Sequence, residues 1–85
     1  MVVHEQSKQI RDLIRYIIQE MVDNPEQVNV SIIESTQSLV IEVSLAKADM
    51  GKLIGKRGRN VDAIRTILRA ASATAKIRTV LEITE

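Results

Sequence analysis

Four residues near the middle of the chain, Gly55-Lys56-Arg57-Gly58, have types and a spacing that suit contact with an anion. Glycine at both ends permits positive φ angles and leaves no Cβ to hold a partner away from the backbone. Lys56 and Arg57 add mobile positive charge. A helical pattern begins directly afterwards, and the free N–H groups and dipole of a helix N-terminus favour negative charge. The segment therefore predicts a close approach to phosphodiesters, although a glycine-capped basic turn between two helices explains the same residues structurally.

The better-known phosphate motifs do not fit this segment. A nucleotide-binding P-loop needs G-x-x-x-x-G-K followed by Ser or Thr. Here only three residues separate Gly51 from Gly55, and Arg57 follows Lys56, so the hydroxyl that would hold magnesium is missing. The dinucleotide fingerprint G-x-G-x-x-G is also absent. The sequence therefore argues against an NTPase and against a dinucleotide-dependent enzyme.

Catalytic groups are sparse elsewhere too. The single histidine, His4, lies near the start of the chain, there is no cysteine, and no serine has a potential base close to it in sequence. Asp49 and Asp62 flank the glycine segment, but each occupies a position where the first turn of a helix favours an acid. We therefore expect no catalytic residues, no metal site and no cofactor.

Positive charge is concentrated in the second half of the chain. The formal net charge is only +1, yet residues 47–78 contain nine Lys and Arg against two acidic residues, a local net charge of +7. Such a block is typical of a surface that binds a polyanion. On charge alone, two interpretations of this block remain open: a surface that binds nucleic acid, and an ordinary helix surface exposed to solvent.

Length and composition predict one small domain spanning residues 1–85. Leu, Ile and Val supply 27 of the 85 residues, which is enough for an aliphatic core. The lack of cysteine suits a reducing compartment. The opening residues lack the pattern of a signal peptide, and no apolar run approaches the roughly 20 residues of a membrane span. We expect a cytoplasmic protein with no membrane partner and no small-molecule substrate.

Hydrophobic periodicity predicts the elements of the first half. Apolar residues recur with helical spacing from about residue 5 to 22, and Pro25 disfavours helix just beyond. Residues 28–32 and 39–45 alternate apolar and polar side chains, as strands do. Only the short segment 34–38 connects these strands, so they should form an antiparallel hairpin.

The second half predicts a helical turn over 49–54, a longer helix from Arg59 and a strand over 77–83. The long helix has an apolar face made of Val61, Ile64, Leu68, Ala71 and Ala75. A helical crossover of about thirty residues should return the last strand parallel to the second strand, with right-handed connection. The predicted fold class is α+β, in the order α-β-β-α-α-β, with a three-stranded mixed sheet whose helices pack on one face. Water should wet the other face.

These features resemble a known family. The string "KLIGKRGRNVDAIR" resembles the signature of KH domains, and α-β-β-α-α-β is the order of their type II, prokaryotic version. The strings "VDNPEQVNV", "DMGKLIGKRGR" and "AIRTILRAA" are similar to the small bacterial RNA-binding proteins of the KhpA family, which have a single KH domain. The similarity spans nearly the whole chain and is most specific over residues 49–71. The segment 72–77 departs from the relatives, which are richer in Lys and Asn there.

The resemblance implies that the loop clamps the backbone of about four nucleotides of single-stranded RNA. Ile54 and Val61 would form part of a groove floor, or serve equally well as core residues. Tyr16, the only aromatic residue, lies on the distant first helix, so we expect only modest discrimination between bases. Nothing in the loop demands a 2′-hydroxyl, so single-stranded DNA remains a possible ligand. The RNA-binding residues implied are Lys52, Ile54, Gly55, Lys56, Arg57, Gly58, Arg59 and Val61.

The resemblance also implies an RNA chaperone or post-transcriptional regulator that forms a homodimer, or a heterodimer with a larger KH-containing protein. The residues offer an interface of their own, because Ile67 lies beside Ala63, Ala70 and Thr74 on a second strip of the long helix. Alternatively, Ile67 is only the edge of the core stripe. A protein-assembly module that uses the KH fold as a dimerisation scaffold is the competing function.

Overall fold

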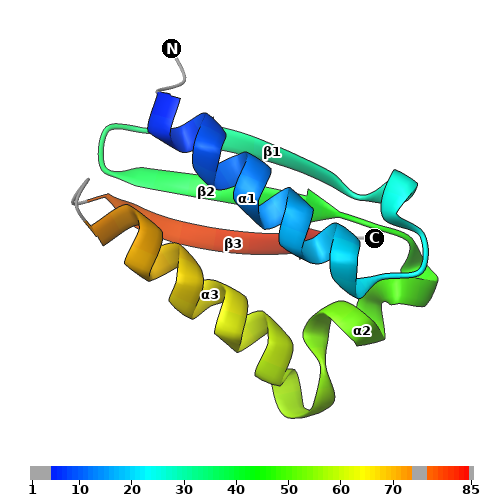
Figure 1. Cartoon of the computed structure of the whole chain (residues 1–85). Helices are drawn as coiled ribbons and strands as arrows, with labels where there is room; N and C mark the ends of the chain where they lie inside the picture. Colours follow the sequence, from blue (N-terminus) through cyan, green and yellow to red (C-terminus); the bar gives the residue numbers. More distant parts are fainter. Residues whose placement is uncertain (1–4, 74–76, 85) are drawn as a thin grey trace.

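The computed structural model describes residues 5–73 and 77–84. Three α-helices and a three-stranded sheet make up most of the described chain, with short 3-10 turns between them (Figure 1). The elements follow one another as α1 (Glu5–Met21), η1 (Pro25–Gln27), β1 (Asn29–Glu34), β2 (Ser38–Ser44), η2 (Lys47–Asp49), α2 (Met50–Ile54), η3 (Lys56–Gly58), α3 (Arg59–Ser72) and β3 (Arg78–Thr84). The predicted α+β class and the order of its helices and strands are confirmed.

The sheet has the order β1-β2-β3. β1 pairs with β2 in antiparallel fashion, and the Ser35 N–H closes their turn on the Ser38 carbonyl at 2.9 Å. β2 pairs with β3 in parallel fashion, after a crossover that contains α2 and α3. Both predicted pairings are therefore confirmed. The observed β1 runs to Glu34, two residues beyond the predicted strand, because the connecting turn is shorter than expected.

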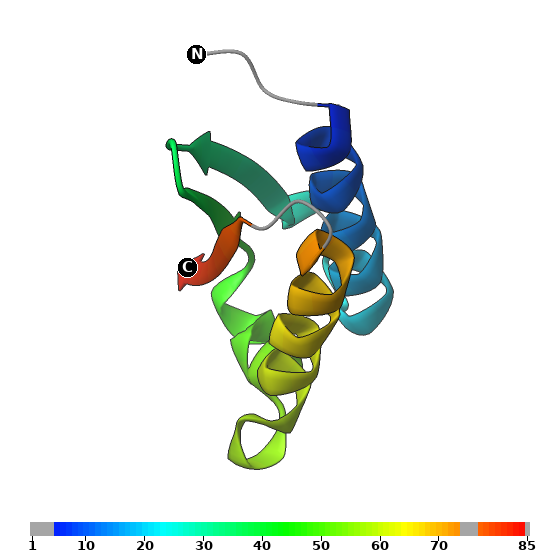
Figure 2. The same cartoon turned by 90° about the vertical axis from the view of Figure 1, so that its left-hand side faces the viewer.

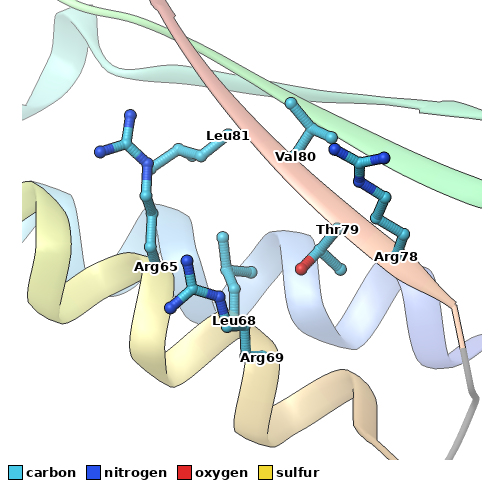
Figure 3. A pocket seen from close by; sticks show the side chains of 7 residues that line it. All are labelled: Arg65, Leu68, Arg69, Arg78, Thr79, Val80 and Leu81. Carbon is cyan, nitrogen blue, oxygen red and sulfur yellow. The ribbon is translucent and has the colours of Figure 1, made fainter.

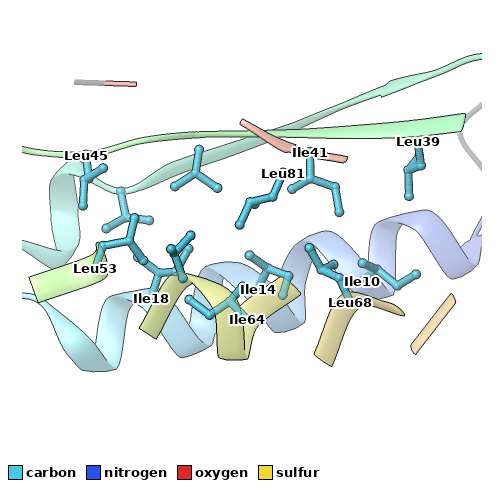
Figure 4. Close-up of a cluster of buried hydrophobic side chains, with 13 residues drawn as sticks. Ile10, Ile14, Ile18, Leu39, Ile41, Leu45, Leu53, Ile64, Leu68 and Leu81 are labelled. Atoms are coloured by element: carbon cyan, nitrogen blue, oxygen red, sulfur yellow. The ribbon is translucent and has the colours of Figure 1, made fainter. Parts of the chain in front are cut away.

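The helices form a layer on one face of the sheet (Figure 2). α1 and α3 lie side by side and run in opposite directions (Figure 1), and the Gln6 side chain donates to the Ala71 carbonyl at 3.4 Å. Burial of aliphatic side chains between the layers drives this packing. The core contains apolar residues from α1, α2, α3, β2 and β3 and from the segments just before β1 and just after β2 (Figure 4); they are Ile10, Ile14, Ile18, Val28, Leu39, Ile41, Val43, Leu45, Leu53, Val61, Ile64, Leu68 and Leu81.

The outer face of the sheet is less polar than the alternation predicts. Ile33 is 53 % exposed there, and its register partner Val40 pairs in turn with Val80 of β3. A row of three aliphatic side chains therefore crosses an otherwise polar face. No helix in the described part of the chain has the length and apolar character needed to cross a membrane.

Candidate functional site

The glycine segment forms a tight loop between α2 and α3. Gly55 (φ 76°) and Gly58 (φ 75°) both have positive φ, as their sequence positions predict. Arg57 also has a positive φ, of 58°, which the sequence does not reveal. A left-handed conformation costs a non-glycine residue about 1–2 kcal/mol. Backbone hydrogen bonds hold the loop, from Gly55 N–H to the Gly51 carbonyl at 2.9 Å and from Gly58 N–H to the Gly55 carbonyl at 3.1 Å.

Asn60 closes the base of this loop. Its side-chain amide donates to the Lys52 carbonyl at 2.9 Å, which ties the first turn of α3 to α2. The side chain also lies against Gly55, where a Cβ would approach Cγ of Asn60 to 2.6 Å. Gly55 is therefore required both for its φ angle and for the space that Asn60 occupies. Sequence reasoning did not identify Asn60, whose only local signal is a short amide two residues after the second glycine.

The tip of the loop presents positive charge at one end of the helical layer, where the α2–α3 connection projects away from the sheet (Figure 2). Lys56, Arg57 and Arg59 are exposed, and none of them forms an ion pair within residues 5–73 and 77–84. Gly58 is the N-cap residue of α3, so no side chain caps this helix. Successive N–H groups in such a turn form a concave site suited to anions. The backbone N–H groups and the basic side chains of the loop therefore both favour an anionic ligand.

Lys52 and the two apolar residues of the predicted site have different surroundings. Lys52 pairs with Asp23, at the end of α1. Ile54 is 38 % exposed beside the loop, whereas Val61 is 7 % exposed and belongs to the core. A Cβ on Gly58 would lie 4.0 Å from Cγ1 of Val61, so Val61 supports the loop from beneath. The structure therefore brings the eight predicted residues to one end of the molecule, with Val61 under the others.

Asp49 precedes the first turn of α2, as the sequence predicts, but it is also buried, which the sequence does not indicate. Its side chain is 1 % exposed and accepts hydrogen bonds from the Asp23 N–H at 3.2 Å and the Asn24 N–H at 3.0 Å. The Asn24 side-chain amide adds a third bond at 3.1 Å. Burial raises the pKa of Asp49, but these bonds and the charge of Lys52 outweigh it, so the pKa is lowered. Asp49 thus fastens the start of α2 to the turn after α1.

The predicted interface strip lies on the outer surface of α3. Ile67 is 39 % exposed and is not part of the core cluster, and Ala63 and Ala70 are exposed beside it. Thr74, the fourth residue of the predicted strip, lies outside the described residues, as do Ala75 and His4. An exposed isoleucine between alanines leaves a shallow apolar surface that a second helix can approach.

Comparison with known families agrees with the geometry. A family model described as the KH domain of KhpA and KhpB matches residues 11–83, which include the glycine loop, β1, β2 and all of β3 except its last residue. The chain belongs to the KhpA/KhpB family of KH domains. The resemblance drawn from the sequence strings is therefore confirmed, and the α+β fold with its mixed sheet is that of a KH domain.

Individual members of the KhpA/KhpB family resemble the chain along almost their whole length. The RNA-binding protein KhpA of Caldanaerobacter subterraneus is 46 % identical over 72 residues, covering 85 % of this chain and 96 % of the relative. The proteins of the same name from Clostridium acetobutylicum and Chlamydia pneumoniae are 42 % and 41 % identical, covering 87 % and 89 % of this chain and 99 % and 97 % of the relatives. No solved structure matches the chain.

Proposed function

We propose that this protein binds single-stranded RNA and that the loop from Gly55 to Gly58 holds the RNA backbone. One observation carries the proposal: a loop with positive φ at both glycines presents three basic side chains at a helix N-terminus that no side chain caps, and these three form no ion pair with any residue that the structure describes. Membership of a family whose relatives are named RNA-binding proteins supports RNA as the ligand.

Each residue of the loop region has a distinct part in this proposal. Gly55 and Gly58 let the phosphates approach the backbone, because neither carries a Cβ. Lys56 and Arg57 contact the phosphates of about four nucleotides, and Arg59 extends the positive surface into α3. Lys52 reaches a neighbouring phosphate once it leaves Asp23, and Ile54 offers apolar surface to the bases above Val61.

A clamp of this size binds weakly by itself, so we propose that the protein acts with a second KH domain, as an RNA chaperone or post-transcriptional regulator. The partner is a second copy of this chain or a larger KH-containing protein, held through Ala63, Ile67, Ala70 and Thr74 of the long helix. Two clamps held together raise the effective concentration of the second binding event and hence the avidity for long RNA.

The test is a titration of short single-stranded RNA against a Lys56→Asp, Arg57→Asp variant whose fold is checked by circular dichroism. We expect affinity to fall at least about tenfold, because two phosphate contacts become repulsive. The matched control is Lys8→Asp, Arg15→Asp, which makes the same change of charge on exposed positions of α1. Equal affinities of the loop variant and this control would contradict the proposal.

A second function, that of an assembly module, is favoured by the exposure of Ile67 between alanines on α3. In this alternative the KH fold is mainly a dimerisation scaffold. The loop variant separates the two functions, since a scaffold keeps its cellular activity when Lys56 and Arg57 are replaced, whereas an RNA clamp loses it.

A further inference from the structure

Among the residues that the structure describes, ion pairs occupy two basic side chains of the positively charged block 47–78, and the two pairs differ in kind. Arg65 pairs with Asp62 of the same helix at 3.3 Å and lines a cavity of about 310 Å³ between α3 and β3 (Figure 3). Such pairs form between neighbouring positions on any helix surface. Lys52 instead pairs with Asp23, 29 positions earlier in the chain. This second pair therefore depends on the packing of the turn after α1 against α2.

A buried carboxylate holds the backbone of Asp23 beside α2. The Asp23 N–H donates to one oxygen of Asp49 at 3.2 Å, and the Asn24 N–H donates to the other at 3.0 Å. Asp49 is 1 % exposed, and the loss of hydrogen bonds to a buried carboxylate is destabilising. Because the main chain of Asp23 makes the bond, its side chain can face Lys52. Asp49 thus keeps the Asp23 carboxylate close to Lys52.

Lys52 is the one basic residue of the candidate site that has an ion-pair partner in the described part of the chain. Lys56, Arg57 and Arg59 form no ion pair there. Lys52 also belongs to the structure of the loop, because its carbonyl accepts the hydrogen bond that closes the loop. A ligand that approaches the loop therefore meets three basic side chains with no counter-ion among the described residues, and a fourth whose charge Asp23 balances.

The pair between Lys52 and Asp23 is weak enough for a phosphate to displace. The Lys52 side chain is 47 % exposed and that of Asp23 is 74 % exposed, so water screens their attraction. Lys52 has three N–H donors on a flexible stem, so its ammonium can turn from the carboxylate to a phosphate while its main chain stays in α2. The exchange still gives up the attraction that Asp23 supplies, and RNA affinity is lower by that amount.

We infer that Asp23 limits the affinity of the loop for RNA by holding the Lys52 ammonium, and that binding transfers Lys52 from Asp23 to a phosphate. The inference rests on the proposed function of the loop. Asp23 is then an affinity-determining residue, and Asp49 is the positioning residue behind it. The pair also favours a continuous strand over small anions, because only a ligand already held at the loop brings a phosphate to Lys52 at high effective concentration.

The experiment is a double-mutant cycle on the affinity for a single-stranded RNA decamer, measured by fluorescence anisotropy. Asp23→Asn should bind the decamer about two- to fivefold more tightly than wild type, which corresponds to the strength of an exposed ion pair. Lys52→Met should bind more weakly than wild type, because one phosphate contact is lost. In Lys52→Met the further change Asp23→Asn should alter the affinity by less than about 1.5-fold, since no ammonium remains to be released.

The matched control is Glu20→Gln, which removes an exposed carboxylate from the last turn of α1. Glu20 forms no ion pair within residues 5–73 and 77–84, so this variant should bind the decamer within about 1.5-fold of wild type. Asp23→Asn retains the main-chain N–H that donates to Asp49, so it should keep the fold, as circular dichroism measures.

Other outcomes overturn the inference in distinguishable ways. An equal gain from Asp23→Asn in wild type and in Lys52→Met would show general charge repulsion and no held ammonium. An unchanged affinity of Asp23→Asn would show that the pair does not limit binding. If Lys52→Met binds as tightly as wild type while Lys56→Asp, Arg57→Asp binds weakly, the inference fails and the proposed function stands. If that loop variant keeps its affinity while the cycle gives the expected values, the proposed function of the loop fails and the hold of Asp23 on Lys52 stands.

Discussion

The side-chain amide of Asn60 donates a 2.9 Å hydrogen bond to the main-chain carbonyl of Lys52, and in doing so it lies across Gly55. Lys52 belongs to α2 and Asn60 to α3, so this bond closes the loop between them. It also uses the space in which any other residue at position 55 would place its Cβ. The two glycines of the loop therefore have unequal structural roles.

Alanine substitutions at the three glycines should separate these roles. Gly55→Ala should lower the free energy of unfolding by roughly 2–4 kcal/mol, because it combines a strained φ with an overlap against Asn60. A Cβ at position 58 would have no atom closer than 4.0 Å. Gly58→Ala should therefore lower the free energy of unfolding by only about 1–2 kcal/mol, because of the positive φ angle. Urea denaturation measures both values.

Gly51→Ala is the control for this series, because it lies in α2 with no atom within 4 Å of a new Cβ. It should stabilise the protein by about 0.5–1 kcal/mol, since alanine loses less backbone entropy in a helix. A Gly55→Ala protein as stable as the Gly58→Ala protein would show that Asn60 moves aside at little cost.

Asp49 should make the stability of the protein depend on pH. Its pKa in the folded protein is lowered from the ordinary value of 3.8, so its stabilising contribution is fully present above that value. The contribution is lost as the pH falls through the lower, folded-state pKa. Wild type should therefore exceed Asp49→Asn in free energy of unfolding at pH 7, and the difference should narrow below pH 3.8. Denaturant titrations at a series of pH values provide the measurement.

Glu20→Gln is the matched control, because Glu20 is an exposed carboxylate on α1. At pH 7 it should change the free energy of unfolding by less than about 0.5 kcal/mol. A difference between wild type and Asp49→Asn that stays constant from pH 7 to pH 3 would contradict the assigned role of the Asp49 carboxylate.

RNA affinity should depend on salt in proportion to the phosphates that the loop contacts. A clamp that neutralises roughly three to four phosphates of a single strand predicts a slope of about −2 to −3 for log K against log salt. Lys56→Met, Arg57→Met removes two contacts and should bring the slope about 1.4 closer to zero. Titrations of one short RNA between 50 and roughly 300 mM salt give both slopes. A wild-type slope near zero would exclude the basic loop as the binding surface.

Self-association should depend on Ile67. Ile67→Asp places a charge in the centre of the proposed strip without touching the core, so the protein should remain folded and become monomeric. Affinity for a long RNA should then fall at least about tenfold through lost avidity, while affinity for a tetranucleotide should stay within about twofold. Analytical ultracentrifugation measures the mass of each protein.

Ile33→Asp is the control for this interface, since Ile33 is exposed on the face of the sheet opposite to its core residues. It should leave the assembly state unchanged. A wild-type monomer at high concentration, or an Ile67→Asp protein that remains dimeric, would remove this interface.

The local elements, and through them the topology, follow from the pattern of amino acids along the chain. Spacing of isoleucines at four-residue intervals requires a helix with one buried face, and the alternation in β2 requires a half-buried strand. A right-handed helical crossover then leaves β3 beside β2. The positive φ angles at Gly55 and Gly58 were also predictable, because each glycine stands at the end of a short loop between helical patterns.

Which distant side chains meet depends instead on how the elements pack against one another. Nothing in the local pattern indicates that Asp49 is buried against Asn24, 25 positions earlier, or that Lys52 pairs with Asp23, 29 positions earlier. Hydrophobic periodicity specifies which face of an element is buried, because the period follows from backbone geometry. It does not specify which polar groups come together, since that depends on the relative placement of packed elements that are far apart in the chain.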